Sequence, residues 1–189
     1  MTNYTWGSDG VGRGNYAGIN IWCICGIPEG VILPVKDSKK TNKKQRVEIV
    51  NQIKDKCIWQ LGSVTSSYID NFGISAGEAT AFSKAYSLFK KNITNIYSDL
   101  GAPSFFGKLN KIKDADALIP AVSAASIFAK YALDLYWEQV HEHYPQYDFI
   151  KNAGYGVKAK EKIAEYGLIK DIHRKSYKPC RDYLNEKSN

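Results

Sequence analysis

Three aspartates, far apart along the chain, stand where an α/β protein usually binds its ligand. Asp9 closes the first strand-like segment, Asp99 closes a later one, and Asp116 comes shortly before the longest helical pattern. Ligands of open α/β sheets bind beyond the strand ends, so we expect these carboxylates to converge. Converging carboxylates repel one another unless a cation lies among them, and Mg²⁺ or Mn²⁺ accepts such an oxygen shell. Two such ions can clamp a phosphodiester under attack. The alternative is that each aspartate only caps a helix or turns a loop.

A glycine cluster beside Asp9 has two interpretations. Residues 12–17 fit the pattern G-x-G-x-x-A, and Asp37 follows roughly twenty residues later, as in a dinucleotide site. Such a site needs a helix after the glycines, whereas residues 19–25 are strand-like. We therefore favour a turn in which glycines let the backbone approach a ligand while Arg13 supplies a fixed positive fork.

Charge and cysteine usage narrow the class of protein. The 189 residues suit one domain with a small C-terminal appendage, and a hydrophobic content of 44% excludes a disordered chain. Neither a signal peptide nor an apolar run of roughly 18 residues is present. The net charge of +7 favours nucleic acid as a partner, although a merely soluble basic protein has the same balance. Four cysteines without CxxC spacing are expected to be buried thiols of a reducing cytoplasm.

Histidines offer little for catalysis. His141 and His143 are two residues apart on a predicted helix, so they do not share a face, and we expect them at the surface. His173 and Arg174 lie in a basic tail, where they contact phosphate or are simply solvated.

The elements that must position these residues follow from residue patterns. Strand-like segments precede an alternation with helices, and the chain ends in a helical tail, which predicts a layered α/β architecture. The predicted strands are 4–9, 16–27, 57–64 and 95–99, and the predicted helices are one capped by Thr41, then 75–89, 120–143 with Pro120 at its first position, 158–166 and 181–184.

Taken in order, several motifs resemble those of the ribonuclease HII family, the type 2 ribonucleases H. The resemblance covers nearly the whole chain. Its motifs are Gly7–Gly14 for the first strand end and turn, Asp37–Lys40 for DSKK, Tyr97–Asp99 for the second aspartate, Asp116 with Ser123–Lys130 for the third aspartate and its helix, Gly154–Gly156, and His173–Tyr177.

The resemblance implies an RNase H-like fold, with a mixed β-sheet flanked by helices. Residues 1–145 would form the catalytic domain, and residues 146–189 a helical extension packed on it. It also implies a monomeric cytoplasmic endoribonuclease that cuts RNA in RNA–DNA hybrids and incises 5′ of single ribonucleotides in duplex DNA. Asp9, Asp99 and Asp116 would hold two metal ions, Mg²⁺ or Mn²⁺.

By the same resemblance, one group of residues would bind the substrate. The turn formed by Gly12, Arg13 and Gly14 would sense the ribose 2′-hydroxyl, which distinguishes RNA from DNA, and Tyr155 would stack on the next deoxyribose. Phosphate contacts, which position a duplex without reading its sequence, are expected from Ser38, Lys39, Lys40, His173 and Arg174.

One departure bears directly on activity. The family carries a metal-site glutamate beside the first aspartate, and this chain has Gly10 there. Asp114 would share a face with Asp116 if that segment were extended, and it would then restore a carboxylate. Two hypotheses therefore stand: an attenuated ribonuclease, and a catalytically disabled protein of the same fold that binds RNA–DNA hybrids or junctions.

Overall fold

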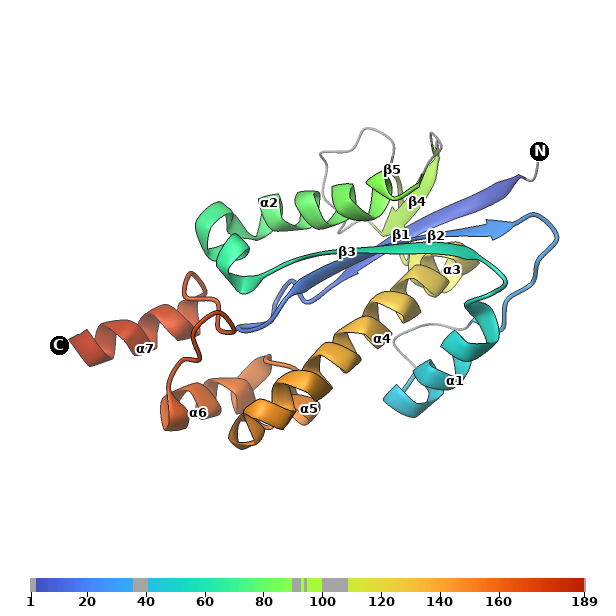
Figure 1. Cartoon of the computed structure of the whole chain (residues 1–189). Coiled ribbons are helices and arrows are strands. Elements are labelled where there is room, and N and C mark those ends of the chain that lie inside the picture. Colours follow the sequence, from blue (N-terminus) through green and yellow to red (C-terminus); the bar gives the residue numbers. More distant parts are fainter. Residues whose placement is uncertain (1–2, 36–40, 90–92, 94, 100–108, 189) are drawn as a thin grey trace.

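A mixed five-stranded sheet runs through the centre of the molecule in a computed structural model that describes residues 3–35, 41–89, 93, 95–99 and 109–188 (Figure 1). The strand order is β3-β2-β1-β4-β5, with antiparallel pairing among the first three and parallel pairing from β1 to β5. The strands are β1 (Tyr4–Val11), β2 (Asn20–Pro28), β3 (Ile58–Val64), β4 (Ile96–Asp99) and β5 (Leu109–Ile112).

Helices cover both faces of the sheet, as predicted. In Figure 1, α2 lies on one face, and α1, α3 and α4 lie on the other. The helices are α1 (Lys43–Ile53), α2 (Ser66–Ser87), α3 (Ala115–Leu118), α4 (Pro120–His143), α5 (Phe149–Asn152), α6 (Gly156–Tyr166) and α7 (Lys178–Ser188), with the 3-10 turn η2 (Pro145–Tyr147) between α4 and α5. Within the described ranges, no helix has the length and apolarity needed to cross a membrane.

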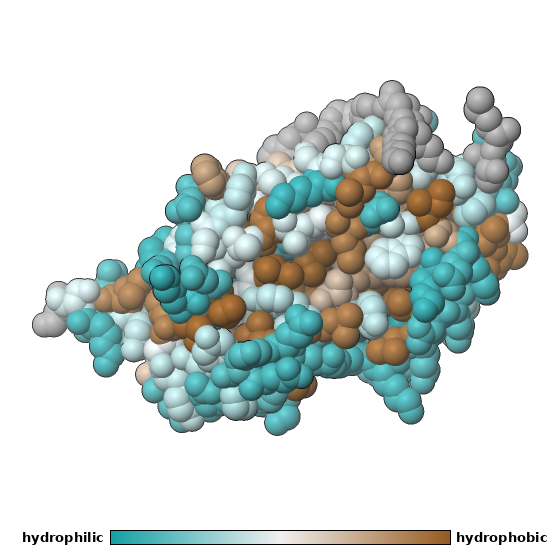
Figure 2. Space-filling model, in the orientation of Figure 1, coloured by the Kyte–Doolittle hydropathy of each residue, from teal (hydrophilic) through white to brown (hydrophobic). Residues whose placement is uncertain are grey.

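Strand β2 joins two hydrophobic cores because its side chains alternate between the faces. Ile21, Cys23 and Cys25 pack toward α4, whereas Trp22 and Ile24 pack in the core that includes α2. Full burial of a large apolar side chain stabilises a fold by about 1.5–3 kcal/mol. Figure 2 shows hydrophobic residues gathered between α2 and α4, and hydrophilic residues over α1. The sheet is thus held rigidly from both sides.

Helix α4 approaches the sheet closely at β1. Pro120 occupies its first turn, as predicted, where a missing N–H costs nothing. A side chain at Gly7 would place its Cβ 2.7 Å from the Ala121 carbonyl oxygen, so glycine is required for this approach. The close packing brings Ser126 and Lys130 beneath Asp9.

The connection between β1 and β2 is longer than the predicted tight turn, and β2 begins at Asn20 rather than at residue 16. Residues 16–18 pair with the C-terminal part of the chain instead. The Tyr16 N–H donates to the Gly154 carbonyl at 2.7 Å, and the Gly18 N–H donates to the Ile172 carbonyl at 2.7 Å. Because a strand follows the glycines, the helix that a dinucleotide site requires is not there.

Two helix starts differ from their predictions. Asn42, not Thr41, caps α1, since its side chain accepts from the Gln45 N–H while the Gln45 side chain accepts from the Asn42 N–H. Helix α2 begins at Ser66, well before residue 75, and it bends at Gly73, whose φ of 81° is left-handed. A glycine is therefore what allows two helical segments to join.

Short elements and one thiol also depart from expectation. Strand β5 was not predicted, because Leu109–Ile112 is short and half polar. Three of the four cysteines are buried thiols as expected, but Cys57 is only half-buried.

Candidate active site

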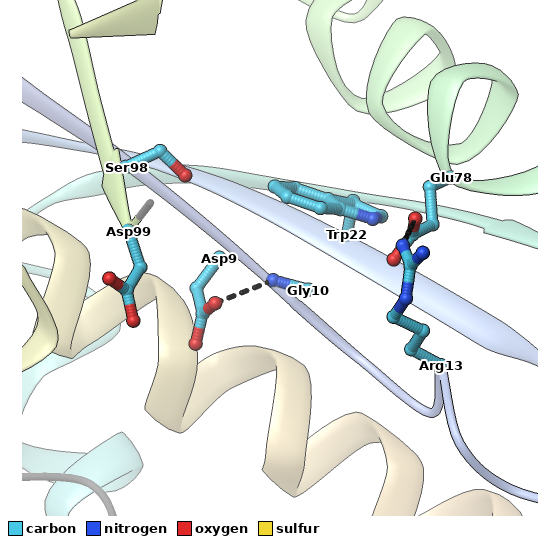
Figure 3. A pocket seen from close by; sticks show the side chains of 7 residues that line it. All are labelled: Asp9, Gly10, Arg13, Trp22, Glu78, Ser98 and Asp99. Carbon is cyan, nitrogen blue, oxygen red and sulfur yellow. Dashed lines mark hydrogen bonds and ion pairs between the residues drawn. The ribbon is translucent and has the colours of Figure 1, made fainter. Parts of the chain in front are cut away.

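Asp99 ends β4, Asp9 lies two residues before the end of the neighbouring parallel strand β1, and both aspartates face the same cavity. Gly7 pairs with Tyr97 across these strands, so residues two further along reach the same level. The cavity measures about 160 Å³ (Figure 3). Its lining residues are Asp9, Gly10, Arg13, Trp22, Glu78, Ser98 and Asp99.

The surroundings of Asp9 act on its pKa in opposite directions. Burial raises the pKa of its carboxyl, and the nearby Asp116 charge raises this pKa further. A hydrogen bond with Ser126, the Gly10 N–H at 2.9 Å and the Lys130 charge oppose that rise without cancelling it. A cation beside Asp9 would favour the ionised form that burial disfavours.

Asp116 is buried in the first turn of α3, close enough to act on Asp9, but it is not among the residues that line the cavity. Asp114 does not compensate for Gly10 as an extended segment would allow. It has a left-handed backbone (φ 55°) before α3 and is exposed. That conformation turns the chain, so the two acids do not share one face.

The donor set suits a hard divalent cation, although the arrangement is incomplete. Mg²⁺ is usually held by one or two carboxylates together with water and substrate phosphate oxygens, and Asp9 and Asp99 offer that number in one cavity. In the part of the chain that the structure describes, no three His, Cys, Asp or Glu side chains form a ready coordination group. The carboxylates therefore fit a cation that substrate helps to hold.

Trp22 explains why position 10 is a glycine. The two residues pair across β1 and β2, and a Cβ at Gly10 would lie 2.6 Å from Trp22 Nε1, closer than real Cβ atoms come. The indole is 3% exposed, and its Nε1 has no hydrogen-bond partner among the described residues. The indole thus fills the volume that a glutamate at position 10 would need.

The turn that carries Arg13 is held from below by a buried arginine. Gly12 has φ 85°, which favours glycine. Arg174 is 0% exposed, and its guanidinium donates to the carbonyls of Gly12 (2.7 Å), Gly18 (3.0 Å) and Ile19 (3.0 Å). The Tyr177 hydroxyl donates to the Arg13 carbonyl at 2.6 Å. The backbone of the turn is therefore fixed before any ligand arrives.

The remaining expected substrate residues are placed differently from one another. Tyr155 is exposed and lies beside Gly14, where an added Cβ would be 3.2 Å from its ring. His173 and Arg174 are buried, which is at odds with a direct phosphate contact and gives both a supporting place behind the turn. Ser38, Lys39 and Lys40, as well as Asp37, lie outside the described residues.

Glu78 was missed from the sequence, although it faces the cavity from α2. It is 4% exposed and forms an ion pair with Arg13, whose side chain is 58% exposed. Burial raises the pKa of Glu78, while Arg13 and then Arg174 lower it. Its signal was an acid on the apolar side of a helix, four residues before Phe82 and seven before Ala85.

Comparisons with known proteins found similar sequences over most of the chain. The family model described as Ribonuclease HII matches residues 6–180. A Ribonuclease HII from Shewanella piezotolerans is 36% identical over 94% of this chain and 90% of its own length.

Solved structures show the same fold. The ribonuclease H2 from Pyrococcus horikoshii OT3 superposes with a TM-score of 0.83 at 24% identity, covering 99% of this chain and 100% of that chain. Bst-RNase HIII in complex with Mn²⁺ gives a TM-score of 0.74 at 17% identity, covering 98% and 70%. The predicted RNase H-like α/β fold is confirmed.

Proposed function

The chain belongs to the ribonuclease HII family, and on that premise we propose that it is a metal-dependent endoribonuclease. It cuts RNA in RNA–DNA hybrids and incises 5′ of single ribonucleotides in duplex DNA. The observation that carries this proposal is the pair of carboxylates, Asp9 and Asp99, facing one cavity beside the Arg13 turn.

In this mechanism the chain's own residues bind and orient the substrate. Asp9 and Asp99, with Asp116 beside them, would hold Mg²⁺ or Mn²⁺. Such ions would supply the activation of a water and the stabilisation of the departing 3′ oxygen. The hydrogen bonds with Ser126 and the Gly10 N–H orient Asp9 and favour its ionised form against the effect of burial. No side chain of the protein needs to act as a nucleophile.

The turn that contains Arg13 and the neighbouring Tyr155 recognise the ribose. Gly12 and Gly14 let the backbone come close to the 2′-hydroxyl, and Tyr155 offers an exposed ring next to Gly14. The 2′-hydroxyl is the group through which a protein distinguishes RNA from DNA. Ser38, Lys39 and Lys40 are proposed to contact phosphate, which holds the duplex in register.

A second candidate function is binding without cleavage. One observation favours it: position 10 has no carboxylate, and Trp22 fills its place. One carboxylate fewer weakens the attraction for divalent cations. The protein would then recognise ribonucleotide-containing duplexes and leave them intact.

One assay separates the two candidates. Duplex DNA with a single labelled ribonucleotide is incubated with the protein under Mg²⁺ and then under Mn²⁺. The enzyme proposal expects a cut 5′ of the ribonucleotide, abolished in Asp99→Asn and retained in the matched control Asp55→Asn, which changes an exposed acid away from the cavity. Tight, 2′-hydroxyl-dependent binding with no cut under either ion would favour the binding protein.

The proposal also includes a monomer acting in the cytoplasm. Free thiols suit a reducing compartment, and the cysteines described here are free. Burial raises the pKa of Cys180 to about 12, which keeps that thiol unreactive. Sedimentation at micromolar concentration should give the mass of one chain, and a dimer would contradict the proposal.

A further inference from the structure

Glu78 is an acid that stability alone does not explain. A buried carboxylate costs free energy unless its partner and hydrogen bonds compensate, and replacing such an ion pair with apolar residues is often neutral or stabilising. Its position within α2 falls on the side that packs Phe82 and Ala85 into the core. A buried acid that has a specific charged partner and lies in a cavity is a candidate for a functional residue.

The ion pair with Glu78 holds the side chain of Arg13, which is otherwise exposed to solvent. Arg13 and Glu78 are 65 residues apart in sequence, and they meet at the cavity that also holds Asp9 and Asp99 (Figure 3). Arg174 and Tyr177 already hold the Arg13 backbone from below. Glu78 accepts from Nη1 of the Arg13 side chain, so both the backbone and the side chain of this residue are held.

A held guanidinium still has donors to offer. The guanidinium carries five N–H donors in a rigid fork. Glu78 accepts from Nη1, which leaves other donors of the fork for a ligand. Trp22 lines the same cavity, and its Nε1 is buried without a partner among the residues described. Donors fixed before binding lower the ordering cost that a substrate otherwise meets.

We propose that Glu78 is a positioning residue that sets specificity: it holds the Arg13 fork over the cavity, where the turn meets a ribonucleotide. This inference rests on the proposed function, since it concerns the same substrate. It predicts that removing the Glu78 charge lowers discrimination between ribonucleotide-containing and all-DNA duplexes. It does not predict weaker binding to nucleic acid in general, because removing an acid leaves the protein more positive.

The test compares dissociation constants for the two duplexes at one salt concentration, in the wild type, Glu78→Gln, Glu78→Asp and the control Glu142→Gln, an exposed acid on α4. The ratio of the dissociation constant for the all-DNA duplex to that for the ribonucleotide-containing duplex should fall roughly tenfold in Glu78→Gln, the lower end of what the loss of one hydrogen bond between charged groups costs. It should fall less in Glu78→Asp, which retains the charge, and not at all in the control. If Glu78→Gln does not fold, Glu78→Asp carries the test.

A double-variant cycle excludes a purely structural role. In an Arg13→Ala background, Glu78→Gln should leave the ratio unchanged, because its effect passes through Arg13. A ratio unchanged by Glu78→Gln in the wild-type background would overturn this inference alone. A wild-type ratio near one would overturn the proposed substrate, and this inference with it.

Discussion

Strands β1 and β2 contain the same packing arrangement twice, once at each end. Gly26 pairs with Trp6 and Gly10 pairs with Trp22, and in each pair the indole occupies the space of a missing side chain. Each indole also meets a phenylalanine edge-on, Trp6 at 83° to Phe89 and Trp22 at 71° to its neighbour in α2.

The two ends differ in what surrounds the indole. Both indoles belong to the core that includes α2. Trp22 also lines the cavity with Asp9, Asp99 and Glu78, and Trp6 is not among the residues that line it. The same packing device therefore stabilises one end and shapes a site at the other.

The largest expected effect belongs to the cavity end alone. Asp99→Asn should reduce cleavage at least about 10³-fold, equivalent to about 4 kcal/mol in the activation barrier, because it removes one of the two aspartate carboxylates that face the cavity. Its melting temperature should change little. Single-turnover cleavage measures the first quantity and thermal unfolding the second. A large fall in the melting temperature together with the loss of cleavage would mean that Asp99 has a structural role.

Acid should destabilise the end of the β1–β2 pair that lies next to the cavity before it destabilises the other end. Burial lowers the pKa of His173 to about 4, so its ring is neutral in the folded protein, where Nδ1 accepts from the Ile169 N–H at 2.8 Å. The unfolded chain binds this proton near pH 6.5, so stability is complete above that pH and falls by about 3 kcal/mol toward pH 4.

Urea unfolding between pH 4 and 7 measures this loss, and His173→Gln should reduce it while His143→Gln, at an exposed site on α4, should not. The protection factors of the amides at residues 16–18, which pair beside His173, should fall at low pH more than those of Gly26 and Ile27. The same pH dependence in the wild type and His173→Gln would contradict the assignment.

Replacing either glycine with alanine adds one methyl group beside an indole, and the loss of stability should be similar in the two glycine–tryptophan pairs. Gly10→Ala and Gly26→Ala should each destabilise the protein by about 2 kcal/mol, because overpacking forces the indole to shift. Only the first should also alter cleavage per folded molecule. Chemical unfolding and an activity assay on matched samples check both statements, and a Gly10→Ala variant as stable as the wild type would refute the packing account.

A smaller effect is expected when the missing acid is restored. Gly10→Glu alone should not tighten Mn²⁺ binding, since Trp22 occupies its place. The double variant Gly10→Glu/Trp22→Ala should tighten it roughly tenfold, because charge count sets cation affinity. Calorimetric titration measures this, with Trp22→Ala as the control. A tighter single variant would show that the indole yields easily.

Local patterns were enough to predict the main frame of the site. Asp99 was placed correctly at the end of β4, and Pro120 marked the start of α4, whereas β1 continues two residues past Asp9 to Val11. Strand β5 was missed, since four residues of mixed polarity carry no period. The division into residues 1–145 and 146–189 stays a prediction.

Tertiary contacts decided the rest. Arg174 sits in a basic tail, where it was expected to contact phosphate or to be solvated, yet carbonyls over 150 residues away in the sequence accept hydrogen bonds from its guanidinium. Glu78 reads as an ordinary helix acid until Arg13 is seen beside it. Nothing local to residue 10 reveals that Trp22 fills its space. Partners this distant in sequence leave no short-range pattern.

Locating a bound cation is the most direct test of the central claim. Crystals grown with Mn²⁺ and a ribonucleotide-containing duplex should show an anomalous peak between the carboxylates of Asp9 and Asp99, and the peak should vanish in Asp99→Asn. A peak elsewhere, or none at all while the duplex is bound, would contradict a metal-dependent nuclease built on these two aspartates.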